Sequence, residues 1–160
     1  MSNTPPPSQL CLLSDLPLRE VGDKVRFLGC VASYSTDSAT LALEHQHQQP
    51  QDSLAVRALV DVRLVLGRLG SDQTRIGEWV NVIGYITAVA PLPLPTAASK
   101  GSDRGHVNIS MIRIQALLVW SAGPLDVQRY NSSVAALGSE QSSPSGGDVA
   151  SDALLHAAGR

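Results

Sequence analysis

The sequence predicts an all-β fold, a small closed barrel of five strands followed by a C-terminal helix. Two long apolar segments, 25–35 and 78–89, each carry a glycine near the middle, Gly29 and Gly84. A glycine weakens a strand unless the sheet bends there or another backbone comes close. Long strands that curl around a shared core are typical of small barrels. Aromatic residues make up only 4% of the chain, so we expect an aliphatic core.

The segment order supports this fold from the N-terminus onward. Residues 1–9 are polar and rich in proline, which indicates a flexible arm, and the apolar segment 10–18 is expected to lie against the barrel. A hairpin turn at 36–39 joins the first two strands, and a polar loop follows the second. The expected strands are 25–35, 40–44, 54–61, 78–89 and 107–120.

Between the third and fourth strands the periodicity becomes helical. Apolar residues recur at i, i+3, i+4 and i+7, and Gly70 ends the pattern. These residues are Val62, Val65, Leu66 and Leu69. A helix at this point is the arrangement of the five-stranded OB barrel, whereas an SH3-like barrel lacks it and a layered α/β fold would need more helices. The sequence therefore predicts one OB-fold barrel over residues 10–122.

The segment 123–138 predicts an amphipathic helix, with Pro124 suited to its first turn and Gly138 at its end. Its apolar stripe is Val127, Tyr130, Val134 and Leu137. The stripe either packs on the barrel of its own chain or pairs with a helix of another subunit, and periodicity does not choose between these interpretations. For the second, the expected partner-contact residues are Leu125, Arg129, Tyr130, Val134 and Leu137. Residues 139–160, rich in Ser, Gly and Ala, are expected to be a disordered tail.

Composition and motifs argue against several classes of function. The chain has no nucleophile elbow, phosphate-cradling glycine loop, HExxH motif or paired-carboxylate arrangement, so we expect no enzymatic activity and no cofactor. Cys11 and Cys30 are expected to be reduced and buried. His45 and His47 lie in a polar, Gln-rich tract, which favours a loop over a metal site. No run approaches the ~18 apolar residues that span a bilayer, so we expect an intracellular protein without a membrane segment.

OB barrels commonly bind single-stranded nucleic acid through stacking aromatics and a cationic groove. The chain has 12 Lys and Arg against 14 Asp and Glu, whereas proteins that grip phosphates usually show a basic excess. Because aromatic residues are also few, we expect any direct binding to DNA to be weak. The arginines are equally consistent with a solvated strand face. Trp79 and Trp120 are expected in the core or an interface. The nucleic-acid candidates are Arg26, Tyr34, Arg57, Tyr85, Lys100, Arg104 and Arg113.

Four segments taken in order, followed by a terminal helix, resemble the fungal small subunit, Ten1, of the telomere-capping CST complex, which is itself similar to the small subunit of replication protein A. The resemblance covers about residues 9–137. The segments are Ser8–Pro17, Val25–Val31, Ala58–Val62 and Gly77–Tyr85.

The resemblance implies a non-enzymatic subunit in a tight heterodimer with Stn1, formed by the terminal helices and the adjoining barrel surface. It places Leu125, Arg129, Tyr130 and Val134 at the contact. It also implies a nuclear protein at telomeres, which works with a larger CST subunit to cap the single-stranded overhang and supports fill-in by DNA polymerase α–primase. Two alternatives remain open: an independent OB protein that binds single-stranded nucleic acid, and an OB adaptor of a non-telomeric partner.

Overall fold

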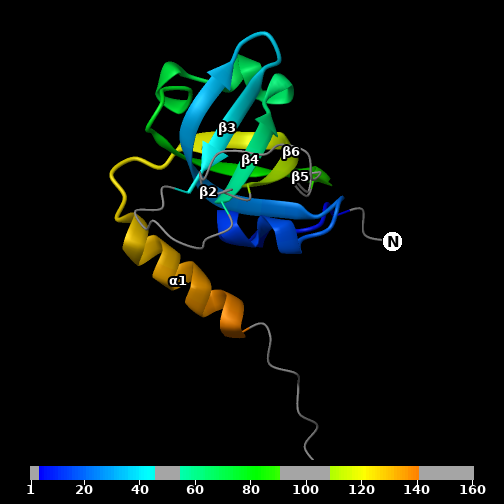
Figure 1. Ribbon diagram of the computed structural model, residues 1–160, viewed down its shortest axis with the longest axis vertical. Coiled ribbons are helices and arrows are strands. Elements are labelled where there is room, and N and C mark those ends of the chain that lie inside the picture. Colours follow the sequence, from blue (N-terminus) through cyan, green and yellow to red (C-terminus); the bar gives the residue numbers. More distant parts are fainter. Residues whose placement is uncertain (1–3, 46–54, 91–108, 141–160) are drawn as a thin grey trace, which may run out of the picture.

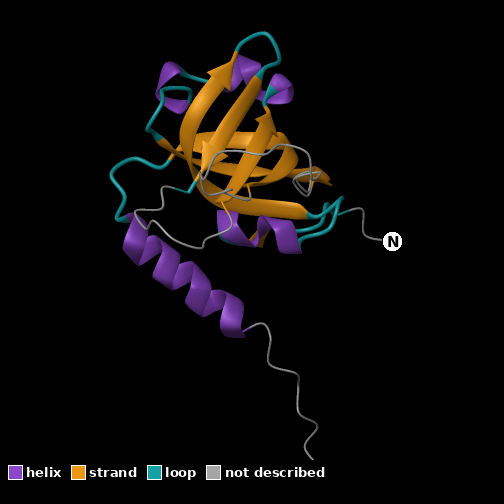
Figure 2. Cartoon of the chain, in the orientation of Figure 1, coloured by secondary structure: helices purple, strands orange, loops and turns teal. Residues whose placement is uncertain are grey.

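Five strands close a barrel in the computed structural model of the chain, which describes residues 4–45, 55–90 and 109–140 (Figures 1 and 2). The strands are β2 (Lys24–Ser35), β3 (Thr40–Glu44), β4 (Ala55–Asp61), β5 (Trp79–Ala90) and β6 (Ile109–Ser121). Around the barrel their order is β2-β3-β4-β6-β5, and β5 pairs back with β2. This is the OB topology, so the predicted fold class is confirmed.

The long strand β2 belongs to both walls of the barrel. Its first half pairs antiparallel with β5 and its second half pairs antiparallel with β3. The register with β3 shifts between Val31 and Ser33, and such an irregularity bends a strand and increases its twist. β4 and β6 pair in parallel, although two short helices and β5 lie between them in the sequence. This pairing closes the barrel.

The two central glycines lie where elements approach closely. A Cβ on Gly84 would overlap the main-chain oxygen of Gln115 on β6 and lie 2.7 Å from Ile114 Cγ2. A Cβ on Gly29 would lie 2.9 Å from Leu43 Cβ. The register between β5 and β6 also shifts next to Gly84. Both glycines are therefore required by close packing inside the curved sheet.

The core is aliphatic apart from Phe27, which is fully buried. An N-terminal segment closes one end of the barrel. Its two-residue strand β1 (Gln9–Leu10) pairs parallel with β2 and leads into the 3-10 helix η1 (Leu13–Leu18), where Leu13 and Leu16 are buried within the core cluster. Sequence reasoning placed this segment against the barrel but missed the strand, and Gln9 is paired although it falls in the predicted flexible arm.

The helix predicted between the third and fourth strands is a 3-10 helix, η2 (Arg63–Arg68), followed by a second short one, η3 (Ser71–Gln73). Three residues per turn suffice to bring Val62 and Val65 onto one face, and both are buried. Leu66, which an α-helix would have added to that face, is 46% exposed.

The terminal helix is α1 (Val127–Glu140). Asp126 caps it, because its Oδ1 accepts a hydrogen bond of 3.1 Å from the Arg129 amide and its main-chain oxygen accepts one of 3.0 Å from the Tyr130 amide. The predicted start at Pro124 is therefore too early, since Gly123 turns the chain with φ 65° before the cap. The helix also continues through Gly138 for two residues. Most of the predicted tail lies outside the described residues.

Candidate functional site

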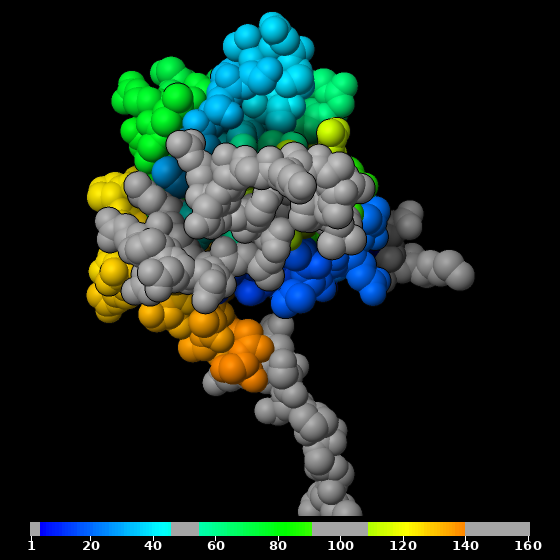
Figure 3. Space-filling view, in the orientation of Figure 1, coloured from blue at the N-terminus to red at the C-terminus, as the bar shows by residue number. Residues whose placement is uncertain are grey.

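The terminal helix lies outside the barrel, near the N-terminal segment (Figure 3). Asn131 Nδ2 lies 3.0 Å from His45 Nε2, and the His45 ring meets the Trp79 ring edge-on at 6.0 Å. Val134 is only 6% exposed, although it is not part of the barrel core. The middle of α1 is thus held against its own chain, while its last turns extend beyond the barrel (Figure 1).

Tyr130 contributes to the same docking. Its hydroxyl is buried and has no hydrogen-bond partner among the described residues. Burial raises the pKa of Tyr130 above its ordinary value, the positive charge of Arg26 opposes this rise, and Cys11 adds to it. These influences place the tyrosine near the start of β2 and the end of β1.

The five predicted partner-contact residues therefore fall into two sets. Tyr130 is half-buried and Val134 is buried, so this part of the stripe is covered by the chain itself. Leu125 and Leu137 are 38% and 54% exposed, and Arg129 is exposed. Leu137 continues the stripe beyond its covered part, and it is therefore available to a second surface.

The barrel face formed by β3, β4 and β6 carries two of the nucleic-acid candidates, Arg57 and Arg113. Arg57 lies directly across from Glu44 in the β3–β4 register. The two side chains form an ion pair, in which Arg57 Nε donates to Glu44 Oε1 over 2.6 Å. Arg113 is exposed on β6 next to Leu59.

A second ion pair lies at the end of β4. Arg63 Nε donates to both carboxylate oxygens of Asp61, at 3.0 and 2.9 Å. Hydrogen bonding from Arg63 is the main reason that the pKa of Asp61 lies below its ordinary value. Gln115 on β6 donates to the Asp61 main-chain oxygen over 3.3 Å.

The other nucleic-acid candidates do not join this face. Tyr34 packs against the core cluster. Arg26 lies on β2 with its guanidinium 5.3 Å from the centre of the Trp120 ring, a cation–π geometry. Tyr85 is half-buried on β5, in register with Gln115. Lys100 and Arg104 lie outside the described residues.

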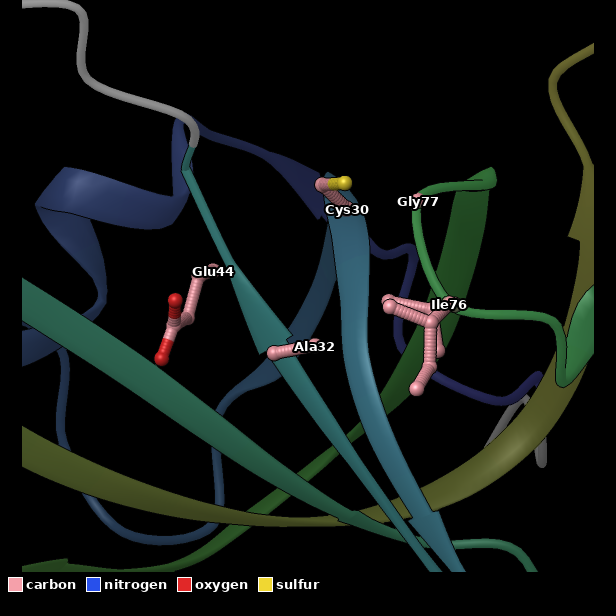
Figure 4. Close-up of a pocket in the computed structure, with 6 residues that line it drawn as sticks. Cys30, Ala32, Glu44, Ile76 and Gly77 are labelled. Carbon is pink, nitrogen blue, oxygen red and sulfur yellow. The ribbon is translucent and has the colours of Figure 1, made fainter.

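A shallow hollow of about 210 Å³ opens between β2, β3 and the loop before β5 (Figure 4). Ile76, which is 72% exposed, forms one side, and Cys30, Ala32 and Glu44 form the others. The lining holds one thiol, Cys30, and one carboxylate, Glu44, which is paired with Arg57. Sequence reasoning did not identify this hollow, because Ile76 lies in a loop without periodicity.

Both cysteines are free and buried, which confirms that prediction. Burial is the main cause that raises the pKa of Cys11 to about 11 and also raises that of Cys30. In the described part of the chain, no group of three His, Cys, Asp or Glu side chains is placed to hold a metal ion. Nor is any helix in it long and apolar enough to cross a membrane. His47 lies outside the described residues.

Comparisons with known proteins agree with the fold. A family model described as telomere capping, CST complex subunit, Ten1, matches residues 1–135. A chain in the crystal structure of the S. pombe Stn1–Ten1 complex is 24% identical with a TM-score of 0.54, and the match covers 84% of this chain and 94% of that one. The S. pombe telomere-capping protein Ten1 is also 24% identical, with a TM-score of 0.53 and coverage of 83% and 99%. No curated protein sequence matches the chain.

Proposed function

Because the chain belongs to the Ten1 family of telomere-capping CST complex subunits, we propose that it is a non-enzymatic OB-fold subunit that forms a heterodimer with a Stn1 protein. A similar S. pombe chain occurs in a structure of an Stn1–Ten1 complex. The observation that carries the proposal is the uncovered end of α1, where the apolar stripe continues past the barrel through Leu137.

The proposed interface combines two parts of the chain. Leu125, Arg129 and Leu137 are exposed and offer apolar and charged anchors to a partner helix. Tyr130 and Val134 are covered by the chain itself, so the role proposed for them in the heterodimer is to present the helix in a fixed position. A preformed surface of this kind reduces the entropy lost on association.

We further propose that the heterodimer, with a larger CST subunit, protects the single-stranded telomeric overhang in the nucleus and supports fill-in by DNA polymerase α–primase. The family match supports a telomeric role. Near-equal numbers of acidic and basic residues support DNA contact mainly through the assembled complex.

The test is capture of the purified chain by its Stn1 partner, with Leu137→Glu as the variant. Leu137 is 54% exposed, so the substitution should leave the thermal unfolding midpoint almost unchanged while weakening capture at least about tenfold, as expected for loss of an interface anchor. Leu64→Glu is the matched control, because Leu64 is 70% exposed on η2, at the other end of the barrel (Figure 1). Wild-type affinity in Leu137→Glu would exclude the helix end from the interface. Tyr130→Ala is less informative because it also removes the helix docking.

A further inference from the structure

On the barrel face formed by β3 and β4, the arginines of β4 and its end form ion pairs with carboxylates of the same face. In the OB fold the second and third barrel strands form the usual oligonucleotide surface, and here those strands are β3 and β4. Glu44 on β3 pairs with Arg57 on β4, and Asp61 on β4 pairs with Arg63 just beyond it. Each cation that faces this surface from β4 or its end thus has an acidic partner within the chain.

The Glu44–Arg57 pair is positioned to compete with a ligand phosphate. The two residues are opposite each other in the antiparallel register, where side chains are direct neighbours. Their side chains are 39% and 40% exposed, so the guanidinium can be reached from solvent, yet its Nε already donates to a carboxylate. A phosphate oxygen would have to replace Glu44 at the donors that Arg57 presents.

The rest of this face offers few side chains on which bases could stack. The outward residues of β3 and β4 between Thr40 and Asp61 that the structure describes include no aromatic ring. Ala42 and Leu59 occupy the middle of the face, and Arg113 on β6 stands beside Leu59. A single strand would therefore be held here through its phosphates, and the arginines decide its affinity.

We propose that Glu44 masks a phosphate-binding site centred on Arg57, and that this carboxylate keeps the affinity of the free chain for single-stranded nucleic acid low. The ligand is the phosphodiester backbone of a single strand, with Arg57 and the neighbouring Arg113 as its cations. The inference deepens the proposed function, from which it takes single-stranded nucleic acid as the ligand, but its test does not require a partner subunit.

The experiment measures binding of a fluorescent oligo(dT) by the full chain, as anisotropy over a series of salt concentrations. Glu44→Gln keeps the size of the side chain and removes its charge, which frees Arg57. We expect binding to tighten about fivefold, near the upper range for a half-exposed ion pair. The slope of log affinity against log salt should steepen by about 0.7, the contribution of one additional phosphate contact on a single strand.

Two controls separate this mechanism from a general change in net charge. Glu78→Gln removes the same charge from a side chain of 41% exposure that also pairs with an arginine, Arg75, in the loop before β5 rather than on β3 or β4. It should leave affinity and slope near wild type. The double variant Glu44→Gln with Arg57→Gln should lose the gain, because the freed guanidinium is gone.

Either of two results would overturn the proposal: a Glu44→Gln affinity equal to that of Glu78→Gln, or a gain that persists in the double variant. Capture of the Stn1 partner, measured on the same samples, should be unchanged by Glu44→Gln. If the Stn1 partner does not capture the wild-type chain, the proposed heterodimer is wrong. The oligonucleotide measurement still decides the role of Glu44 in that case.

Discussion

Substitution of Gly84 by alanine tests how tightly the barrel is closed. The added methyl group would overlap the Gln115 main-chain oxygen and lie 2.7 Å from Ile114 Cγ2. Gly84 lacks the positive φ of Gly22, Gly77 and Gly123, so the cost arises from this overlap alone. The obstructing oxygen belongs to β6, which is paired with β5 along most of its length, and it cannot move without breaking that ladder.

We expect Gly84→Ala to lower the free energy of unfolding by about 3 kcal/mol, the upper end of the range for overpacking in a core. For a domain of this size, that corresponds to a fall of about 10 °C in the unfolding midpoint. Urea denaturation followed by far-ultraviolet circular dichroism gives the free energy, and an unchanged m-value would show that the unfolded state is not affected.

Two other glycines provide the comparison. Gly29→Ala should cost less, about 1–2 kcal/mol, because the atom nearest to its methyl group, Leu43 Cβ, lies at 2.9 Å, a milder overlap than that at Gly84. Gly138→Ala should stabilise α1 by about 0.5–1 kcal/mol, since nothing lies within 4 Å of that position. A Gly84→Ala chain as stable as wild type, or less affected than Gly29→Ala, would refute the close-approach argument.

Two further predictions concern the helix and the cysteines. Tyr130→Phe removes a buried hydroxyl that has no partner among the described residues, so the free energy of unfolding should rise by up to about 1 kcal/mol; a fall of that size in urea denaturation would show that the hydroxyl is bonded. Burial raises the pKa of Cys11 to about 11 and also raises that of Cys30, so at pH 8 both should react slowly with a disulfide reagent in the folded chain and rapidly in urea. Cys30, which lines the open hollow, should react first, and rapid labelling of native Cys11 would contradict its burial.

The strands were predictable because each carries a strong local signal. Segments such as 25–35 and 78–89 are long and apolar, and their glycines indicate the close approach that the structure shows at Gly29 and Gly84. The two-residue β1 carries no such signal, since its pairing with β2 depends on contacts distant in the sequence. The start of α1 could have been found, because Asp126, a preferred capping residue, directly precedes the apolar stripe.

The surfaces were less predictable than the fold. Periodicity identified the stripe on α1 but not how much of it the folded chain covers, so Val134 and Leu137 looked equivalent although they are 6% and 54% exposed. The pairing of Glu44 with Arg57 depends on the register of β3 and β4. About ten residues separate these strands along the chain, and they do not fix that register.

The docking of α1 gives the chain its own optical probe. Of its two tryptophans, Trp79 contacts His45, which reaches Asn131 of α1, whereas Trp120 lies under the Arg26 guanidinium. Movement of the helix would change the surroundings of the Trp79 indole, and an indole that gains contact with water emits at longer wavelength. Intrinsic fluorescence of the unlabelled chain therefore distinguishes a partner that binds the docked helix from one that draws it off the barrel.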